Sequence, residues 1–168
     1  MDRDMGGKEM IGEPAKRISK KALTVWRITR SLFFLCILLI AIGTSSLVII
    51  FDWPLWIIGI AVFVVILYVP IEIYLIPLIK WKRWRYEVRE HEIELQHGVF
   101  IVTRTLVPMV RVQHVDTEQG PVLRKYNLAT VKVSTAATVH EIPALEVEEA
   151  EELRRYISQL ARVADEDV

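Results

Sequence analysis

Apolar residues dominate one part of this chain, and in the next part they alternate with polar residues. Within residues 31–79 the only charged side chains are Asp52 and Glu72, whereas apolar and polar positions alternate from Arg85 onward. A long apolar run is typical of membrane-crossing helices, and alternation is typical of strands with one buried face. The pattern therefore predicts a membrane part at 31–79 and a soluble domain at 80–163.

The apolar part divides into two spans, 31–51 and 54–79. Each can cross a hydrocarbon core of roughly 30 Å, which takes about 20 apolar residues in a helix. Only Asp52 and Trp53 separate the spans, so we expect a tight antiparallel hairpin, with Pro54 at the first position of the second helix. Two buried helices of a soluble protein are disfavoured, because too little sequence remains to cover them.

Basic residues flank both outer ends of the predicted hairpin and are absent from its tip. They are Lys20, Lys21, Arg27 and Arg30 within the basic segment 1–30, and Lys80, Lys82, Arg83 and Arg85 after the second span. The positive-inside rule then predicts a two-span protein of the cell membrane with both termini in the cytoplasm. The second group could also attract anionic lipid, although setting the topology is its simpler role.

Glu72 is the one carboxyl group well inside the apolar part. Counting back from the hairpin turn places it level with Phe33, about one helical turn from Arg30. Because a charge at the centre of a membrane helix costs about 2.5–3.5 kcal/mol, we expect Glu72 to pair with Arg30 or to face a partner helix. A proton or ion relay is the functional alternative. A transporter built on Glu72 would need oligomers, because two spans cannot enclose a pathway.

The soluble part reads as about six strands, or seven, followed by one amphipathic helix. The expected strands lie around Tyr86–Val88, Ile93–Leu95, Val99–Leu106, Val110–Gln119, Ala129–Ser134 and Thr138–Ile142, with a helical turn or irregular connection at Val122–Asn127. Pro143 is expected to stop the last strand. Val147, Ala150, Leu153, Ile157 and Leu160 then recur at helical spacing, before an acidic tail at 164–168.

These elements predict an α+β fold in which a bent sheet or partly open barrel is closed at one end by the C-terminal helix. That is the pleckstrin-homology (PH) architecture. The segments Val107–Thr117 and Gln119–Val131, followed by Thr135–Ala137 and Ile142-Pro143, resemble the bacterial membrane-anchored PH-like domain family. The resemblance covers nearly the whole chain, including the two-span hairpin.

The resemblance implies a PH-like fold and work beside a larger membrane protein that carries several copies of the same domain. It also implies a role in cell-envelope integrity or antimicrobial-peptide resistance, to which related proteins are linked. Fold alone does not settle function. An anionic-lipid-binding or lipid-handling protein is therefore kept as the alternative, and a homo-oligomer is a further candidate assembly.

The sequence contains no recognisable catalytic or cofactor motif. Nucleophile-elbow, phosphate-loop and zinc-protease patterns are missing, and the histidines lack metal-ligand spacing. The single cysteine, Cys36, excludes a disulfide framework within the chain. The first hairpin of the soluble part, Val88–Glu92, has two acids and one arginine, which makes a poor phosphate cradle. We therefore expect no enzyme, no cofactor, no metal site and no nucleic-acid partner; membrane lipids are the expected contacts.

A candidate partner surface remains in the soluble part. His114 and Asp116 fall on one face of a predicted strand, and a basic turn follows the Gly120-Pro121 break. The full set is Arg111, His114, Asp116, Arg124, Lys125 and Tyr126. A solvated loop is the simpler interpretation of the basic turn, and a contact surface for a partner domain is the functional one.

Overall fold

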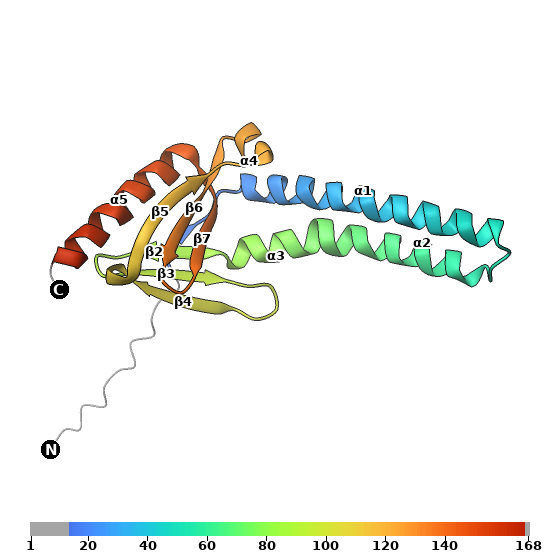
Figure 1. Ribbon diagram of the computed structural model, residues 1–168, viewed down its shortest axis with the longest axis horizontal. Helices are drawn as coiled ribbons and strands as arrows, with labels where there is room; N and C mark the ends of the chain where they lie inside the picture. The colour runs from blue at the N-terminus through green and yellow to red at the C-terminus, as the bar shows by residue number, and fades with distance from the viewer. Residues whose placement is uncertain (1–13, 167–168) are drawn as a thin grey trace, which may run out of the picture.

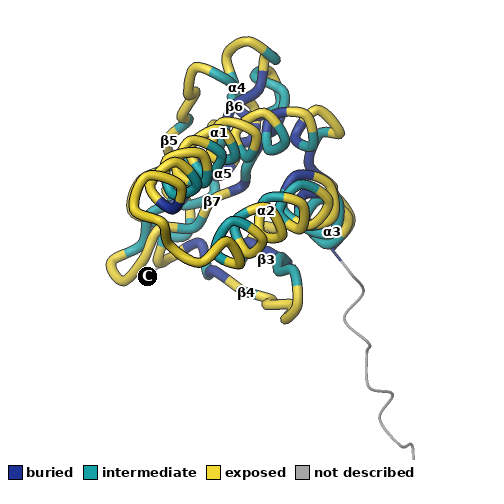
Figure 2. The backbone as a smooth tube through the Cα atoms, turned by 90° about the vertical axis from the view of Figure 1, so that its right-hand side faces the viewer, coloured by how far each residue is buried: buried dark blue, intermediate teal, exposed yellow. Residues whose placement is uncertain are grey.

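A long helical hairpin leaves one end of a β-rich domain in the computed structural model, which describes residues 14–166 (Figure 1). The first arm is α1 (Lys21–Ile50). The second arm consists of α2 (Trp56–Tyr68), the π-helical segment η1 (Val69–Leu75) and α3 (Ile76–Arg83). Both arms are long and apolar enough to cross a membrane. Most of their surface is exposed, as the yellow segments in Figure 2 show.

Two antiparallel sheets and a C-terminal helix form the domain. One sheet has the order β1 (Lys16–Arg17), β2 (Arg85–Val88), β3 (Glu92–His97) and β4 (Thr103–Pro108); the other has β5 (Val112–Glu118), β6 (Leu128–Thr135) and β7 (Val139–Glu146). A 3₁₀ turn, η2 (Met109–Arg111), joins the sheets, α4 (Pro121–Lys125) links β5 to β6, and α5 (Val147–Glu166) follows β7. The sheets do not close, which confirms the predicted α+β, PH-like fold with an open sheet arrangement.

The hairpin is inserted between two neighbouring strands. β1 precedes it and β2 follows it, yet the two strands pair antiparallel, with Lys16 opposite Tyr86. Ile18, Ala22 and Val25 then continue into the core of the domain. The expected boundary at residue 30 is therefore not a boundary in the structure, because part of the basic segment belongs to the domain. The rest of that segment, with Arg3 and Lys8, lies outside the described residues.

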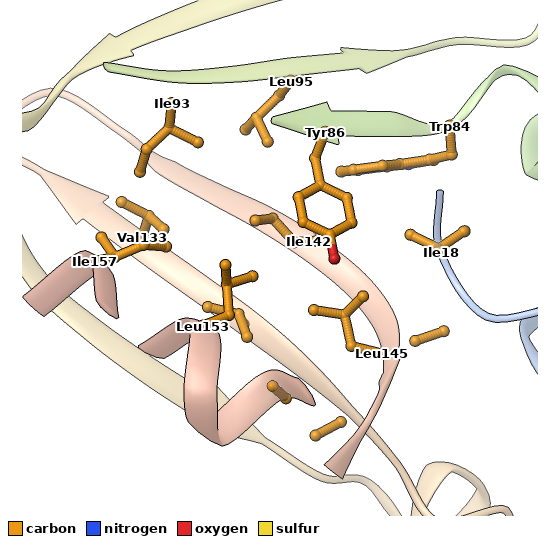
Figure 3. Packing of buried hydrophobic residues seen from close by; sticks show 14 of the residues in the cluster. Ile18, Trp84, Tyr86, Ile93, Leu95, Val133, Ile142, Leu145, Leu153 and Ile157 are labelled. Carbon is orange, nitrogen blue, oxygen red and sulfur yellow. The ribbon is translucent and has the colours of Figure 1, made fainter. Parts of the chain in front are cut away.

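The core lies between the two sheets and α5 (Figure 3). Tyr86 and Leu95 reach it from one sheet, Ile142 from the other, and Leu153 and Ile157 from the helix. Their burial is stabilising at roughly 25 cal/mol per Å² of apolar surface. These helix positions are two of the five that the sequence places on one apolar face, and the helix extends this face against both sheets.

Tyr86 adds a polar link inside the core. Its hydroxyl donates a hydrogen bond of 2.8 Å to Glu149 Oε1 on α5. Burial and this carboxylate together raise the pKa of Tyr86 far above its usual value, so the phenol stays protonated and the bond persists at any physiological pH. The bond fixes the start of α5 against β2.

Two strand boundaries differ from the sequence prediction. The strand expected from Val99 begins only at Thr103, because Gly98 turns the chain with φ +135°, where a Cβ atom would collide with the carbonyl oxygen of Ile101. Pro143 does not end β7. It and Ala144 together face Thr130 in a bulge, which tolerates the missing N–H, and the strand continues to Glu146.

The helix limits also differ from prediction. α1 begins at Lys21 instead of at residue 31, because its first turns pack on the domain as well as leading into the apolar span. The second arm runs on to Arg83 and is interrupted by η1, which contains Pro70. Proline removes a backbone donor inside a helix, and local π-helical adjustment accommodates the loss.

We expect Ile18→Ala to destabilise the domain by about 2–5 kcal/mol, the usual cost of deleting a buried aliphatic side chain. Ile18 is only 3% exposed although it precedes the hairpin. Urea unfolding of the full chain in a mild detergent, followed by near-ultraviolet circular dichroism, measures the change. Lys20→Ala, at an exposed neighbour, is the control. Equal stability of the two variants would show that the segment before the hairpin is not part of the core.

Candidate functional site

An open groove of about 790 Å³ lies between β5 and α5. Its walls are Val110, Val112–Asp116, Ser158, Ala161 and Arg162. Consecutive residues of β5 line it, and not every second one. Because side chains alternate across a strand, a consecutive run means that β5 contributes its backbone edge as well as its side chains. The groove is therefore a slot along a strand edge with a helix as its other wall.

The outer edge of β5 is unpaired within residues 14–166. β5 pairs with β6 on one side, and the sheet order β5-β6-β7 places no described strand on the other. Such an edge offers a row of backbone donors and acceptors to an incoming strand. Gln113, His114 and Asp116 are exposed along it, so the groove joins an unpaired backbone edge to polar side chains.

A short polar chain holds the two walls of the groove together. Thr117 Oγ1 on β5 donates a hydrogen bond of 2.8 Å to Glu151 Oε1 on α5, and Arg154 Nη2 lies 2.8 Å from the other oxygen of this carboxylate. The Thr117 hydroxyl and then the Arg154 guanidinium hold the pKa of Glu151 below its usual range. An ionised carboxylate thus links the two elements that form the groove.

The structure separates the six residues of the candidate partner surface into two groups. Arg111, His114 and Asp116 lie at or beside the groove. Arg124 and Lys125 are exposed on α4, which packs against α1 at the end of the domain from which the hairpin leaves, and Tyr126 follows them, half-buried (Figure 1). They do not form one surface, because α4 and η2 stand at opposite ends of β5.

The basic residues after the second span help to join the hairpin to the domain. Lys80 Nζ sits 4.6 Å from the centre of the Trp26 ring, and Arg83 Nη1 donates a hydrogen bond of 2.6 Å to the carbonyl of Val99. Lys82 is exposed at the end of α3, whereas Arg85 is half-buried as the first residue of β2. These four residues are therefore not equivalent surface charges.

The structure brings Arg30 and Glu72 together. Arg30 Nη1 donates a hydrogen bond of 2.7 Å to Glu72 Oε2, which links α1 to the π-helical segment of the other arm. One turn earlier, the Arg27 guanidinium stacks 5.2 Å from the centre of the Tyr74 ring. Two cations of α1 thus each find a partner on the opposite arm. The geometry provides a contact between the arms and shows no chain of further polar groups that a relay would need within the described part of the hairpin.

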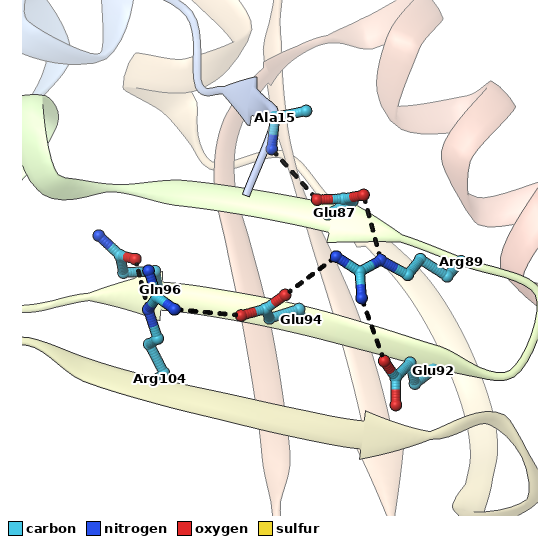
Figure 4. A network of polar contacts seen from close by, with 7 residues as sticks. All are labelled: Ala15, Glu87, Arg89, Glu92, Glu94, Gln96 and Arg104. Carbon is cyan, nitrogen blue, oxygen red and sulfur yellow. Dashed lines mark hydrogen bonds and ion pairs between the residues drawn. The ribbon is translucent and has the colours of Figure 1, made fainter. Parts of the chain in front are cut away.

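The outer face of the first sheet carries a closed polar network (Figure 4). Arg89 contacts Glu87 at 3.1 Å, Glu92 at 3.4 Å and Glu94 at 3.5 Å, and Arg104 lies 3.9 Å from the other oxygen of Glu94. Arg89 is the one arginine of the Val88–Glu92 hairpin, the position of a phosphate cradle in other PH domains. Carboxylates already surround it, so this hairpin is poorly suited to bind an anion.

The described residues hold no group of three or more side chains suited to a metal ion, and Cys36 is an exposed single thiol on α1.

Two surface features of the domain were not predicted from the sequence. The helix wall of the groove, Ser158, Ala161 and Arg162, depends on a contact between α5 and β5 that spacing along the chain does not reveal. The second feature is the loop from Val99 to Val102, which reads as a strand because it is apolar.

Comparison with known proteins identifies similar chains. The family described as Bacterial PH domain matches residues 27–161. UPF0699 transmembrane protein YdbS of Bacillus subtilis (strain 168) is 56% identical over 159 residues, which are 95% of this chain and 100% of YdbS. UPF0699 transmembrane protein YdbT of the same strain is 27% identical over 84 residues, 48% of this chain but only 17% of YdbT. No solved structure matches the chain.

The contact between Arg30 and Glu72 predicts a measurable coupling between the two arms. We expect Arg30→Gln and Glu72→Gln each to destabilise the hairpin, and the double variant to cost less than their sum by roughly 0.5–2 kcal/mol. The reason is that each single change leaves one polar group in the apolar hairpin without its partner. SDS titration of the four proteins in bicelles measures the coupling. A second cycle that joins Glu72→Gln to Ser46→Ala, near the hairpin tip, should be additive.

The polar chain across the groove predicts a pH-dependent stability. Because the folded pKa of Glu151 is lowered, its contribution is present above the ordinary glutamate pKa of about 4.3 and is lost as pH falls through the folded value. Thr117→Val should therefore destabilise the protein at neutral pH, and the difference should shrink in acid. Thermal unfolding across pH tests this. Thr117→Ser, which keeps the hydroxyl, should behave like the wild type; a difference independent of pH would contradict the assignment.

Proposed function

Because the chain belongs to the bacterial PH domain family and to its UPF0699 transmembrane members, we propose that it is a membrane-anchored interaction module. It assembles with a larger membrane protein that carries several PH-like domains. The β5–α5 groove is the docking site. The module has no catalytic role of its own, and it lies in the cell membrane with its domain and both termini on the cytoplasmic side, as the basic flanks favour.

The observation that carries this proposal is the unpaired β5 edge beside α5. An extended peptide can add a strand to such an edge, where backbone hydrogen bonds give affinity and side-chain pockets give specificity. The groove also supplies charges of both signs, since Arg162 stands with Asp116. An isolated small ligand would find an open slot with little enclosure. A strand of a partner protein fits a slot of this shape better.

The comparison with YdbT supports the proposal that the partner is a larger membrane protein. In that protein the segment related to this chain is a small fraction of the length, so similar sequence is found within a much longer transmembrane protein. A partner of that type has its own segments at the same membrane surface, which keeps the groove and the docking strand close together. Tethering two proteins to one membrane raises their effective concentration without any new contact.

The role that we propose for this assembly is support of cell-envelope integrity, including resistance to antimicrobial peptides. The support is the family resemblance of the sequence. The physical contribution of this chain would be to hold its partner at the membrane surface. Loss of docking should therefore weaken resistance even when the protein is still made and inserted.

Photo-crosslinking in living cells tests the docking site. With a benzophenone amino acid at Gln113, on the groove, we expect a covalent product with a larger membrane protein, identified by mass spectrometry. Ala161→Arg, which fills the groove from α5, should reduce the product at least several-fold and sensitise cells to a cationic antimicrobial peptide. Gln159→Arg, an exposed change on the same helix outside the groove, is the matched control.

A benzophenone at Thr138, on the exposed turn between β6 and β7, should give little product. Equal products at Gln113 and Thr138, or no loss with Ala161→Arg, would contradict docking in the groove. Capture of a second copy of this chain alone would replace the larger partner by a homo-oligomer.

Anionic-lipid binding or handling is the second candidate function. The observation that favours it is the position of Arg124 and Lys125 on α4 beside the base of the hairpin, where cations attract anionic headgroups. A protein that served lipid alone would give no protein crosslink at Gln113, and neutralising Arg124 and Lys125 would be the change that impairs it. The same photo-crosslinking experiment therefore separates the two functions.

A further inference from the structure

The loop between β3 and β4 presents large apolar side chains to the outside of the domain. Phe100 is 89% exposed and Ile101 is 80% exposed, and Val102 beside them is also exposed. Elsewhere the large apolar side chains of the domain mostly lie in the core or pack against it. Exposed apolar clusters of this kind mark surfaces that contact another apolar phase. The question is which phase meets this loop.

Two features fix the conformation of the loop, a glycine with positive φ at its start and a hydrogen-bonded arginine near its middle. At its start, Gly98 adopts φ +135°, and no side chain fits there against the carbonyl of Ile101. At its middle, Arg83 Nη1 donates to the carbonyl of Val99 at 2.6 Å and approaches that of Phe100 at 3.5 Å. Trp84 stacks on His97 just before the turn, with 5.8 Å between ring centres. A loop held in this way displays its apolar tip as a built feature.

The residue that holds the loop is the last residue of the second membrane arm. Arg83 ends α3, so the loop is tied directly to the point where the hairpin enters the domain. Figure 1 shows the loop projecting from the sheet along α3, in the direction of the hairpin, and Figure 2, viewed from the hairpin end, shows its exposed tip below α3. The tip therefore points toward the membrane in which the hairpin lies.

The charges around the loop fit a membrane surface. Lys82 is exposed at the end of α3, and Arg104, whose guanidinium also contacts Gln96 and Glu94, is exposed on β4 just beyond the loop. An apolar tip bordered by cations matches the boundary of an anionic bilayer, where aromatic and aliphatic side chains enter the lipid and basic groups stay with the headgroups. A soluble partner would have to compete with the bilayer for this position.

We propose that residues 99–102 insert into the lipid on the side of the membrane from which the hairpin emerges. The domain then contacts the bilayer at three places, which are the two arms of the hairpin and this loop. The loop adds a third contact beside the two arms and so restricts the tilt of the domain and hairpin relative to the bilayer. The inference rests on the loop and the hairpin base and does not depend on docking in the β5–α5 groove.

Spin-label accessibility in lipid vesicles tests the insertion. The full chain, with Cys36→Ser to remove its thiol, carries one nitroxide on a cysteine at position 101 in vesicles of equal parts phosphatidylcholine and phosphatidylglycerol. A label at Ile66 on α2 is the lipid reference, and a label at Val163, in the last turn of α5, is the water reference. We expect oxygen to relax the label at 101 strongly and a water-soluble nickel chelate weakly, as at Ile66.

A second experiment distinguishes a loop that is inserted in lipid from an apolar loop that stays in water. With the label moved to Val102, Phe100→Asp should shift its accessibility toward that of the water reference, because a carboxylate opposes entry into lipid. Leu106→Asp, at an exposed apolar position on β4 away from the tip, should leave the label unchanged. The Val163 label in both variants reports whether the domain is still folded.

Two results would overturn the proposal. Values at position 101 equal to those at Val163 would place the loop in water. Shielding of position 101 from both oxygen and the nickel chelate would place it against protein, from this chain or a second copy, and not in lipid.

Discussion

The pairing of β1 with β2 is the interaction on which the rest of the structure depends. Only Lys16 and Arg17 form β1, yet they join the segment before the hairpin to the sheet that follows it. Ser19 N then donates to the carbonyl of Ala144, and Trp81 Nε1 donates to that of Ile18. Both ends of the hairpin are thereby built into one domain, and the domain sits directly against the membrane arms without a flexible linker.

Charge is arranged in keeping with this attachment. In the hairpin, Arg30 and Glu72 neutralise each other between the arms, so the apolar segments carry little unpaired charge toward lipid. On the outer face of the first sheet, the buried carboxylate of Glu94 lies between Arg89 and Arg104. Strong local pairing of this kind leaves few sites for an anionic ligand. The surfaces that remain available for binding are defined by their shape, and they are the β5–α5 groove and the apolar loop.

Much of this architecture could be predicted because its signals are local. Length and hydropathy define the two spans, counting from the turn places Glu72 near Arg30, and helical spacing identifies the apolar face of α5. The features that escaped prediction depend on distant contacts. A two-residue strand such as β1 is too short to show any periodicity. Pro143 predicts the end of a strand, because the bulge that accommodates it depends on pairing with β6. The groove depends on the packing of α5 beside β5. An apolar stretch such as Val99–Val102 has the same composition in a strand and in an exposed loop.

The insertion of the hairpin between β1 and β2 also sets an order on biosynthesis. The ribosome releases β1 first, and β1 has no partner until the whole hairpin and then β2 have been made. Because β1 and β2 pair on one side of the membrane, an arm that crosses must be followed by one that returns before the sheet can form. A chain in which only one arm crosses has β1 and β2 on opposite sides of the membrane, so Ile18 and Val25 cannot reach the core and the first sheet stays incomplete. Completion of the domain therefore reports that the two ends of the hairpin lie on the same side of the membrane.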